Sequence, residues 1–161
     1  MSGVRTKLNI LVLAFTLALF LVPPVLAKKP LIGTMELDRN PAWYPGAKTL
    51  VPDWVGTVTI DGDEYYMEFY NLETSVSNPG KDGHFDEIWW IKVTATGPTV
   101  LKGTDSGVVS VANSKYRMNG IVTETNTAFA EWLGRQVHMS GVIEWTDEGN
   151  PSAAPGEFRI N

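Results

Sequence analysis

The chain has 161 residues, with 13 Lys and Arg, 18 Asp and Glu and no cysteine, which gives a formal net charge of −5. An acidic chain without a basic run argues against binding to nucleic acid or to anionic lipid, because both depend on Lys and Arg near phosphate. Without cysteine there is neither a disulfide nor a lipid-modified cysteine, so a folded domain must be held together by its core alone.

The first 27 residues have the features of an export signal. Arg5 and Lys7 precede a stretch over residues 10–22 that is apolar at all but one position. Two prolines then break any helix, and the short side chains of Val25 and Ala27 suit a cleavage site. We therefore expect a signal peptide cleaved after Ala27 and an exported protein, either secreted or held at the cell surface or in the periplasm. The alternative is a retained N-terminal membrane anchor, which would need about 20 apolar residues.

Residues 28–161 have the length of one ordinary domain. The first 27 residues contain two basic residues and no acid, so the net charge of residues 28–161 is −7. Short β-branched and aromatic runs separated by Gly, Pro, Asn and Asp predict an all-β fold over this region. A first strand is expected over 31–38, followed by an irregular connection over 39–53, so that 28–53 forms a Pro-rich lead-in with one strand.

The strongest local prediction is a β-hairpin. A strand over 54–60 is followed by Asp61-Gly62, which favours a type I′ turn because both central residues of that turn need a positive φ. The chain is expected to return over 64–72. A long loop over 73–85 then leads to an aromatic strand over 86–95.

In the second half, Gly97-Pro98 predicts a turn before a short strand over 99–102, and Asp105-Ser106-Gly107 predicts another before 108–112. Asn113-Ser114 turns the chain into a strand over 115–125. The one expected helix is short and near 127–133, with Asn126 as its cap and Gly134 at its end. A strand over 135–146, a Gly/Pro-rich loop and a terminal strand over 157–160 complete the chain.

Two of these strands share an internal pattern. Residues 116–122 (YRMNGIV) and 137–143 (VHMSGVI) both place a glycine between a methionine and a β-branched pair. A glycine inside a strand indicates a bend or the close approach of another backbone, which favours the coiled strands of a closed barrel. Gene-level repetition is the alternative.

About eight mostly antiparallel strands with short connections favour a single small barrel, with a β-sandwich as the alternative. The size and the meander are similar to those of secreted calycin-like barrels such as lipocalins. The lipocalin Gly-x-Trp signature is absent from the first strand, so family membership is not inferred.

Strand alternation suggests one binding surface. Tyr65, Met67 and Phe69 share the expected core face, which leaves Tyr66 and Tyr70 on the other face of the same strand. On the strand over 86–95, Trp89, Ile91 and Val93 share a face and Trp90 lies opposite. If the two strands pair, Tyr66, Tyr70 and Trp90 form an outer aromatic patch suited to a sugar, a peptide or a protein. The alternative is that a loop, the 39–53 segment or another subunit covers the patch.

Other polar groups give weaker signals, and no catalytic, metal or cofactor site is assigned. Arg117, His138 and Glu144 share a strand face that is better explained as a solvated outer face. The acidic loop with Asp82, His84, Asp86 and Glu87 resembles no standard metal motif. Asp38, Asp53 and Glu68 are candidates for glycoside chemistry, but nothing in the sequence pairs them.

The leading expectation is a non-catalytic exported barrel that binds a small apolar molecule within it, or a glycan or protein through outer aromatic residues. Nucleic acid is not expected as a partner, and the membrane only if the N-terminal segment is retained. One alternative is a surface-associated structural protein that self-assembles. The other is a small-barrel enzyme of the isomerase or cyclase type, which would need Arg117, His138, Glu68 or Glu144 inside a polar cavity.

Overall fold

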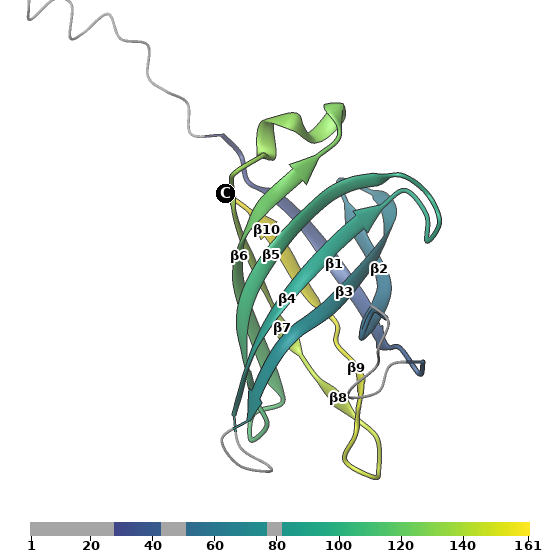
Figure 1. The fold of residues 1–161 in the computed structure, drawn as a ribbon, viewed down its shortest axis with the longest axis vertical. Coiled ribbons are helices and arrows are strands. Elements are labelled where there is room, and N and C mark those ends of the chain that lie inside the picture. Colours follow the sequence, from purple (N-terminus) through teal and green to yellow (C-terminus); the bar gives the residue numbers. More distant parts are fainter. Residues whose placement is uncertain (1–27, 43–50, 77–81) are drawn as a thin grey trace, which may run out of the picture.

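A computed structural model describes residues 28–42, 51–76 and 82–161 (Figure 1). The expected signal peptide or anchor over 1–27 lies outside the described residues, and so does the greater part of the expected connection over 39–53. The elements, in chain order, are β1 (Leu31–Arg39), β2 (Trp54–Ile60), β3 (Asp63–Val76), β4 (Gly83–Lys92), β5 (Thr99–Ser110), β6 (Lys115–Thr125), the 3-10 helix η1 (Thr127–Trp132), β7 (Gln136–Val142), β8 (Glu144–Trp145), β9 (Pro151–Ala153) and β10 (Gly156–Ile160).

The strands form a closed antiparallel barrel of eight strands. Strands β1 to β7 follow one another around the barrel in chain order, and β10 pairs with both β7 and β1 to close it. Strands β8 and β9 pair with each other outside the barrel, and β9 joins β1 through a single pair, Asp38 with Ala153. The expected all-β small barrel is confirmed, and the closed sheet replaces the sandwich alternative.

The hairpin of β2 and β3 forms as predicted. Asp61 and Gly62 have φ angles of 51° and 94°, as a type I′ turn requires. The short helix is also confirmed, as a 3-10 helix over Thr127–Trp132 whose cap Asn126 accepts a hydrogen bond from the Phe129 amide at 3.1 Å. Gly134 ends the segment with a φ of 75°.

Several strand boundaries were predicted wrongly. Residues 73–76 and 83–85 belong to β3 and β4 rather than to a loop, and β5 runs through Asp105-Ser106-Gly107 without a turn. Gly107 lies within the strand because Phe85 of the neighbouring strand occupies the place of a side chain there. Val93 is exposed rather than in the core, because β4 ends at Lys92.

The last predicted strand and loop also differ. The strand expected over 135–146 breaks at Ile143, although the Ile143 amide still donates to Ser114 O at 2.9 Å, next in register after the Lys115–Val142 pair. The Gly/Pro-rich loop that follows contains β9, which pairs with β8.

The two mid-strand glycines mark close backbone contacts, as the barrel interpretation of their pattern predicts. A side chain at Gly120 would collide with the Thr104 carbonyl, and one at Gly141 with the Pro155 carbonyl and the Tyr116 hydroxyl. Both glycines therefore allow neighbouring strands to pack at the curvature of a closed barrel.

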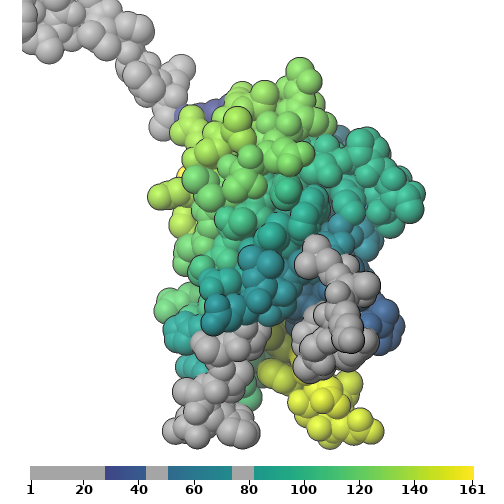
Figure 2. Space-filling view, viewed as in Figure 1, coloured from purple at the N-terminus to yellow at the C-terminus, as the bar shows by residue number. Residues whose placement is uncertain are grey.

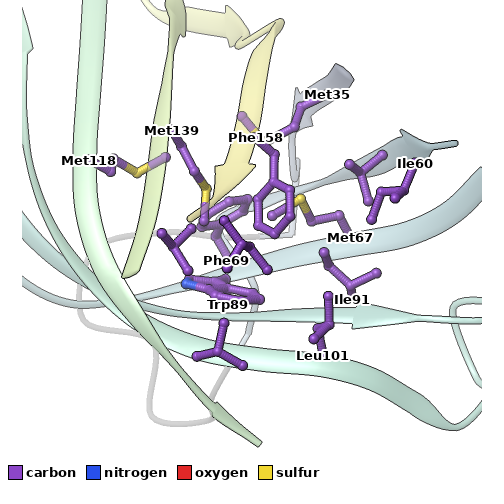
Figure 3. Close-up of a cluster of buried hydrophobic side chains, with 14 of the residues drawn as sticks. Met35, Ile60, Met67, Phe69, Trp89, Ile91, Leu101, Met118, Met139 and Phe158 are labelled. Carbon is purple, nitrogen blue, oxygen red and sulfur yellow. The ribbon is translucent and has the colours of Figure 1, made fainter. Parts of the chain in front are cut away.

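The core is formed by side chains that point inward at alternate positions along the strands (Figure 3). Trp89 lies edge-on to Phe158, with ring centroids 5.7 Å apart, and methionines from four strands fill the space around them. Those methionines are Met35, Met67, Met118 and Met139. Trp132 of η1 is buried, and Phe129 packs on Tyr65, so the helix covers this end of the core.

The two ends of the molecule therefore differ. Helix η1 lies at one end, and the β8–β9 hairpin projects from the opposite end (Figures 1 and 2). Within the described residues, no helix has the length and apolar character needed to cross a bilayer.

Candidate functional site

A cavity of about 240 Å³ lies inside the barrel at the end that carries β8 and β9. Its walls are mainly aromatic and aliphatic, and three charged side chains reach it. The apolar lining comprises Leu37, Trp54, Phe69, Phe85, Val109, Tyr116, Met118, Ile143, Trp145, Pro151 and Ala154, and the charged lining comprises Arg39, Asp53 and Glu87.

Strand alternation places the charged groups inside. Arg39 is the last residue of β1 and follows inward-facing Leu37 by two positions. Glu87 precedes inward-facing Trp89 by two positions on β4, and Asp53 immediately precedes β2. The barrel interior is thus apolar at the η1 end and becomes polar towards the end that carries β8 and β9.

Arg39 and Asp53 form a partly buried ion pair. Arg39 Nη1 lies 3.5 Å from Asp53 Oδ2, and the guanidinium carbon lies 5.1 Å from the centroid of the Trp54 ring. Burial lowers the pKa of Arg39, although the charges of Asp53 and Glu87 oppose this. Burial also raises the pKa of Asp53 to about 6, against the opposing effects of Arg39 and of backbone hydrogen bonds. The second oxygen of Asp53, Oδ1, has no hydrogen-bond partner among the described residues.

Glu87 and Asp105 are direct neighbours across β4 and β5, and both are buried. Burial, reinforced by the charges of Asp53 and Asp105, raises the pKa of Glu87 well above its usual range; Arg39 and a hydrogen bond to Asn71 oppose the shift. The pKa of Asp105 is raised to about 7, chiefly by burial and then by the charges of Asp86 and Asp53. Within the described part of the chain, neither carboxyl oxygen of Asp105 has a hydrogen-bond partner.

Tyr116 closes the polar side of the cavity. Its hydroxyl donates to the Ala154 carbonyl at 3.2 Å, which ties β6 to the segment between β9 and β10. Burial and then the charge of Glu87 raise the pKa of Tyr116, so the hydroxyl remains a donor. The site therefore combines carboxyl acceptors, one guanidinium and an apolar wall, which is the composition of a pocket for a small, mainly apolar molecule.

The residues of the predicted aromatic patch lie together on the outside of the barrel. Tyr70 and Trp90 are in edge-to-face contact, with centroids 4.7 Å apart, and Tyr66 lies across from Lys92. All three side chains are half-buried. Their role in binding stays a prediction.

The polar groups of this patch already have partners. Both tyrosines hydrogen-bond to the buried carboxyl of Glu68, which also forms an ion pair with Lys92. Burial, followed by the charge of Glu68, raises the pKa of Tyr70 to about 12. Lys102 Nζ lies 5.2 Å from the centroid of the Trp90 ring. Because these polar groups already have partners, the patch has fewer free hydrogen-bonding groups for a ligand than the inner cavity has.

The other candidates from the sequence do not meet inside the barrel. Arg117 and Glu144 are exposed, and His138 contacts Asn119 Oδ1 at 2.7 Å on the outer wall. Glu68 is buried, but it lies under the outer aromatic patch. Among Asp38, Asp53 and Glu68, only Asp53 lines the cavity.

Three of the four residues considered for a metal site lie on strand β4, and they do not share one face of it. His84 and Asp86 are exposed on the outer side of the strand, whereas Glu87 is buried on the inner side. Over residues 28–42, 51–76 and 82–161, no cluster of three acidic or histidine side chains is arranged to hold a metal ion.

The sequence pattern did not predict that Arg39, Glu87 and Asp105 belong to one site. Glu87 was detectable, because it lies within the predicted strand over 86–95 and shares the face of Trp89 and Ile91. The inward position of Asp105 was not predicted because a turn was expected there. That of Arg39 was not predicted because the first strand was expected to end at residue 38. Comparisons of the chain with models of protein families, with characterised proteins and with solved structures find no match.

Proposed function

We propose that this protein is an exported, non-catalytic binding protein that takes a small, mainly apolar molecule into the end of its barrel. The observation that carries the proposal is the cavity of about 240 Å³ with aromatic and aliphatic walls. An apolar cavity of about 150 Å³ suffices to bind benzene in another protein, so this volume is adequate for a small organic ligand. Export is proposed from the features of residues 1–27.

The test is a titration with 1-butanol, 1-hexanol and 1-octanol. Binding is measured by calorimetry and by tryptophan fluorescence, to which Trp54 and Trp145 in the cavity wall contribute. Affinity should rise with chain length by roughly 0.8 kcal/mol per buried methylene until the cavity is full. Absence of saturable binding by all three alcohols would refute the proposal.

Two neighbouring valines supply a matched pair of variants. Val109 lines the cavity, whereas Val108 lies on the opposite face of β5. Val109→Phe should fill the cavity and abolish alcohol binding, and Val108→Phe should leave it unchanged. Equal effects of the two substitutions would place binding elsewhere.

A second candidate is an acid–base enzyme, and the raised pKa of Asp53, about 6, at the cavity wall favours it. A carboxyl group that titrates near neutral pH can remove a proton next to a carbonyl group and return it. Cyclohexanone in D₂O is a suitable probe, because exchange of its α-hydrogens is visible by NMR. Catalysed exchange that Asp53→Asn abolishes would favour the enzyme; exchange at the rate of buffer alone would exclude this chemistry for that ketone.

A further inference from the structure

The cavity holds more buried acid than buried base. Asp53 and Glu87, which line the cavity, are 2% and 5% exposed, and the only basic side chain that lines it within the described residues is Arg39. A buried carboxylate is costly unless a positive charge or hydrogen-bond donors compensate it. The interior therefore has room for one more positive group than the chain provides.

Unused acceptors lie at the cavity itself. Asp53 lines the cavity and is almost fully buried, and its Oδ1 atom has no hydrogen-bond partner among the described residues. Its other oxygen faces Arg39 Nη1 at 3.5 Å. Behind Glu87, across the β4–β5 pair, both oxygens of Asp105 also have no partner in the described part of the chain. A ligand that brings N–H donors would satisfy acceptors that the fold leaves open.

The rest of the cavity wall is suited to the same kind of ligand. Five aromatic side chains line the cavity, namely Trp54, Phe69, Phe85, Tyr116 and Trp145. Aromatic faces attract cations through their quadrupole and also provide apolar contact area. Trp54 already has the Arg39 guanidinium near its ring, which shows that this wall accepts a positive group.

We propose that the cavity binds an organic cation, a small apolar molecule with a protonated amine, whose ammonium group lies against the carboxyls of Asp53 and Glu87. This inference rests on the proposed binding function and specifies its ligand class. The amine donates to Asp53 and Glu87, and the hydrocarbon part packs on the aromatic and aliphatic wall.

Binding of a cation should release protons. Glu87 is faced by Arg39 from β1, Asp53 from the segment before β2, Asn71 from β3, Asp105 from β5 and Tyr116 from β6. Burial raises the pKa of Asp53 to about 6 and that of Asp105 to about 7, and it raises the pKa of Glu87 well above its usual range, so these carboxyls hold more protons at pH 6 than at pH 8 when no cation is present. An ammonium group favours their ionised forms, so its affinity should increase from pH 6 to pH 8.

The experiment compares three probes of equal chain length: hexylammonium, 1-hexanol and hexanoate. Calorimetry of the full protein at pH 6 and pH 8 gives their affinities. We expect hexylammonium to bind at least about tenfold more tightly than 1-hexanol at pH 8, which corresponds to about 1.4 kcal/mol. Glu87→Gln should remove that advantage, so that the variant binds hexylammonium and 1-hexanol about equally. Asp86→Asn, the neighbouring acid on the outer side of β4, is the matched control and should change neither.

The outcomes separate this inference from the proposed function. Equal binding of hexylammonium and 1-hexanol would overturn the cation inference and keep the apolar-ligand function. Tightest binding of hexanoate would also overturn it, because Arg39 would then dominate. Absence of binding by all three probes would overturn both. A hexylammonium advantage that survives Glu87→Gln and Asp53→Asn would show that these carboxyls do not hold the amine.

Discussion

Replacing Asp105 by Asn should stabilise the protein at neutral pH and leave its stability unchanged in acid. Asp105 is 5% exposed, and its two carboxyl oxygens have no hydrogen-bond partner in the described residues. The folded protein therefore favours the neutral acid, whereas the unfolded chain exposes the carboxyl to water and ionises it readily. An amide has nearly the same shape as the neutral acid and carries no charge at any pH in this range.

The magnitude follows from the difference between the two pKa values of Asp105. Its pKa is raised from 3.8 to about 7 on folding, mainly by burial. Because the folded state binds the proton more tightly, the wild-type protein loses stability as pH rises from about 4 to about 7, by about 1.4 kcal/mol per pH unit. The total loss of stability is about 4 kcal/mol, and this loss is complete above about pH 7. Below about pH 4 both states carry the proton and the penalty vanishes.

Urea unfolding of the wild type and of Asp105→Asn at pH 4, 6 and 8 checks this prediction. The two curves should coincide at pH 4, and the variant should be more stable by several kcal/mol at pH 8. Glu157→Gln is the control, since Glu157 is exposed on β10, and its effect should be small and equal at all three pH values. A stability difference for Asp105→Asn that does not change with pH would refute the reasoning, and so would a variant that is less stable at pH 8.

Three further predictions test the fold and the export signal. Gly103→Ala should destabilise the barrel by about 1–3 kcal/mol in urea unfolding, because the new methyl group would overlap the Trp89 ring; an unchanged midpoint would contradict the packing. Asn126→Ala should cost about 0.5–2 kcal/mol, because the Phe129 amide loses its 3.1 Å side-chain acceptor and keeps only the Asn126 carbonyl at 3.2 Å. Mass spectrometry of the protein exported from a bacterial host should find Lys28 as the first residue. A first residue of Met1 or Ser2 would instead indicate a retained anchor.

Local patterns in the sequence predicted much of the fold. Asp61-Gly62 determines a turn because few other residue pairs accept two positive φ angles, and β2 and β6 have the predicted bounds. The alternation of Met67 and Phe69, and of Trp89 and Ile91, identified the core faces of β3 and β4 before the strand pairs were known. Gly120 and Gly141 favoured a closed barrel because a glycine inside a strand indicates a bend or a close backbone approach, and both glycines do lie against a neighbouring carbonyl.

The errors arose where a local signal competed with a contact made by a distant residue. Asp105-Ser106-Gly107 has the composition of a turn, but Phe85 fills the space beside Gly107, so the strand continues through it. The inward position of Asp105 follows from that continuation alone. The outer patch of Tyr66, Tyr70 and Trp90 could be placed by alternation, whereas the occupation of its polar groups by Glu68 and Lys92 could not.

By itself, the sequence determined the β-rich class of this protein, its main hairpin and the two faces of its central strands, since turn chemistry and strand alternation are properties of neighbouring residues. Only the tertiary structure decided that Arg39, Asp53, Glu87 and Asp105 meet inside the barrel. These four residues come from four separate parts of the chain, and closure of the sheet through β10 and β1 encloses them together. Their shared burial, and the pKa shifts that follow from it, depend on that closure and on no pattern within any one strand.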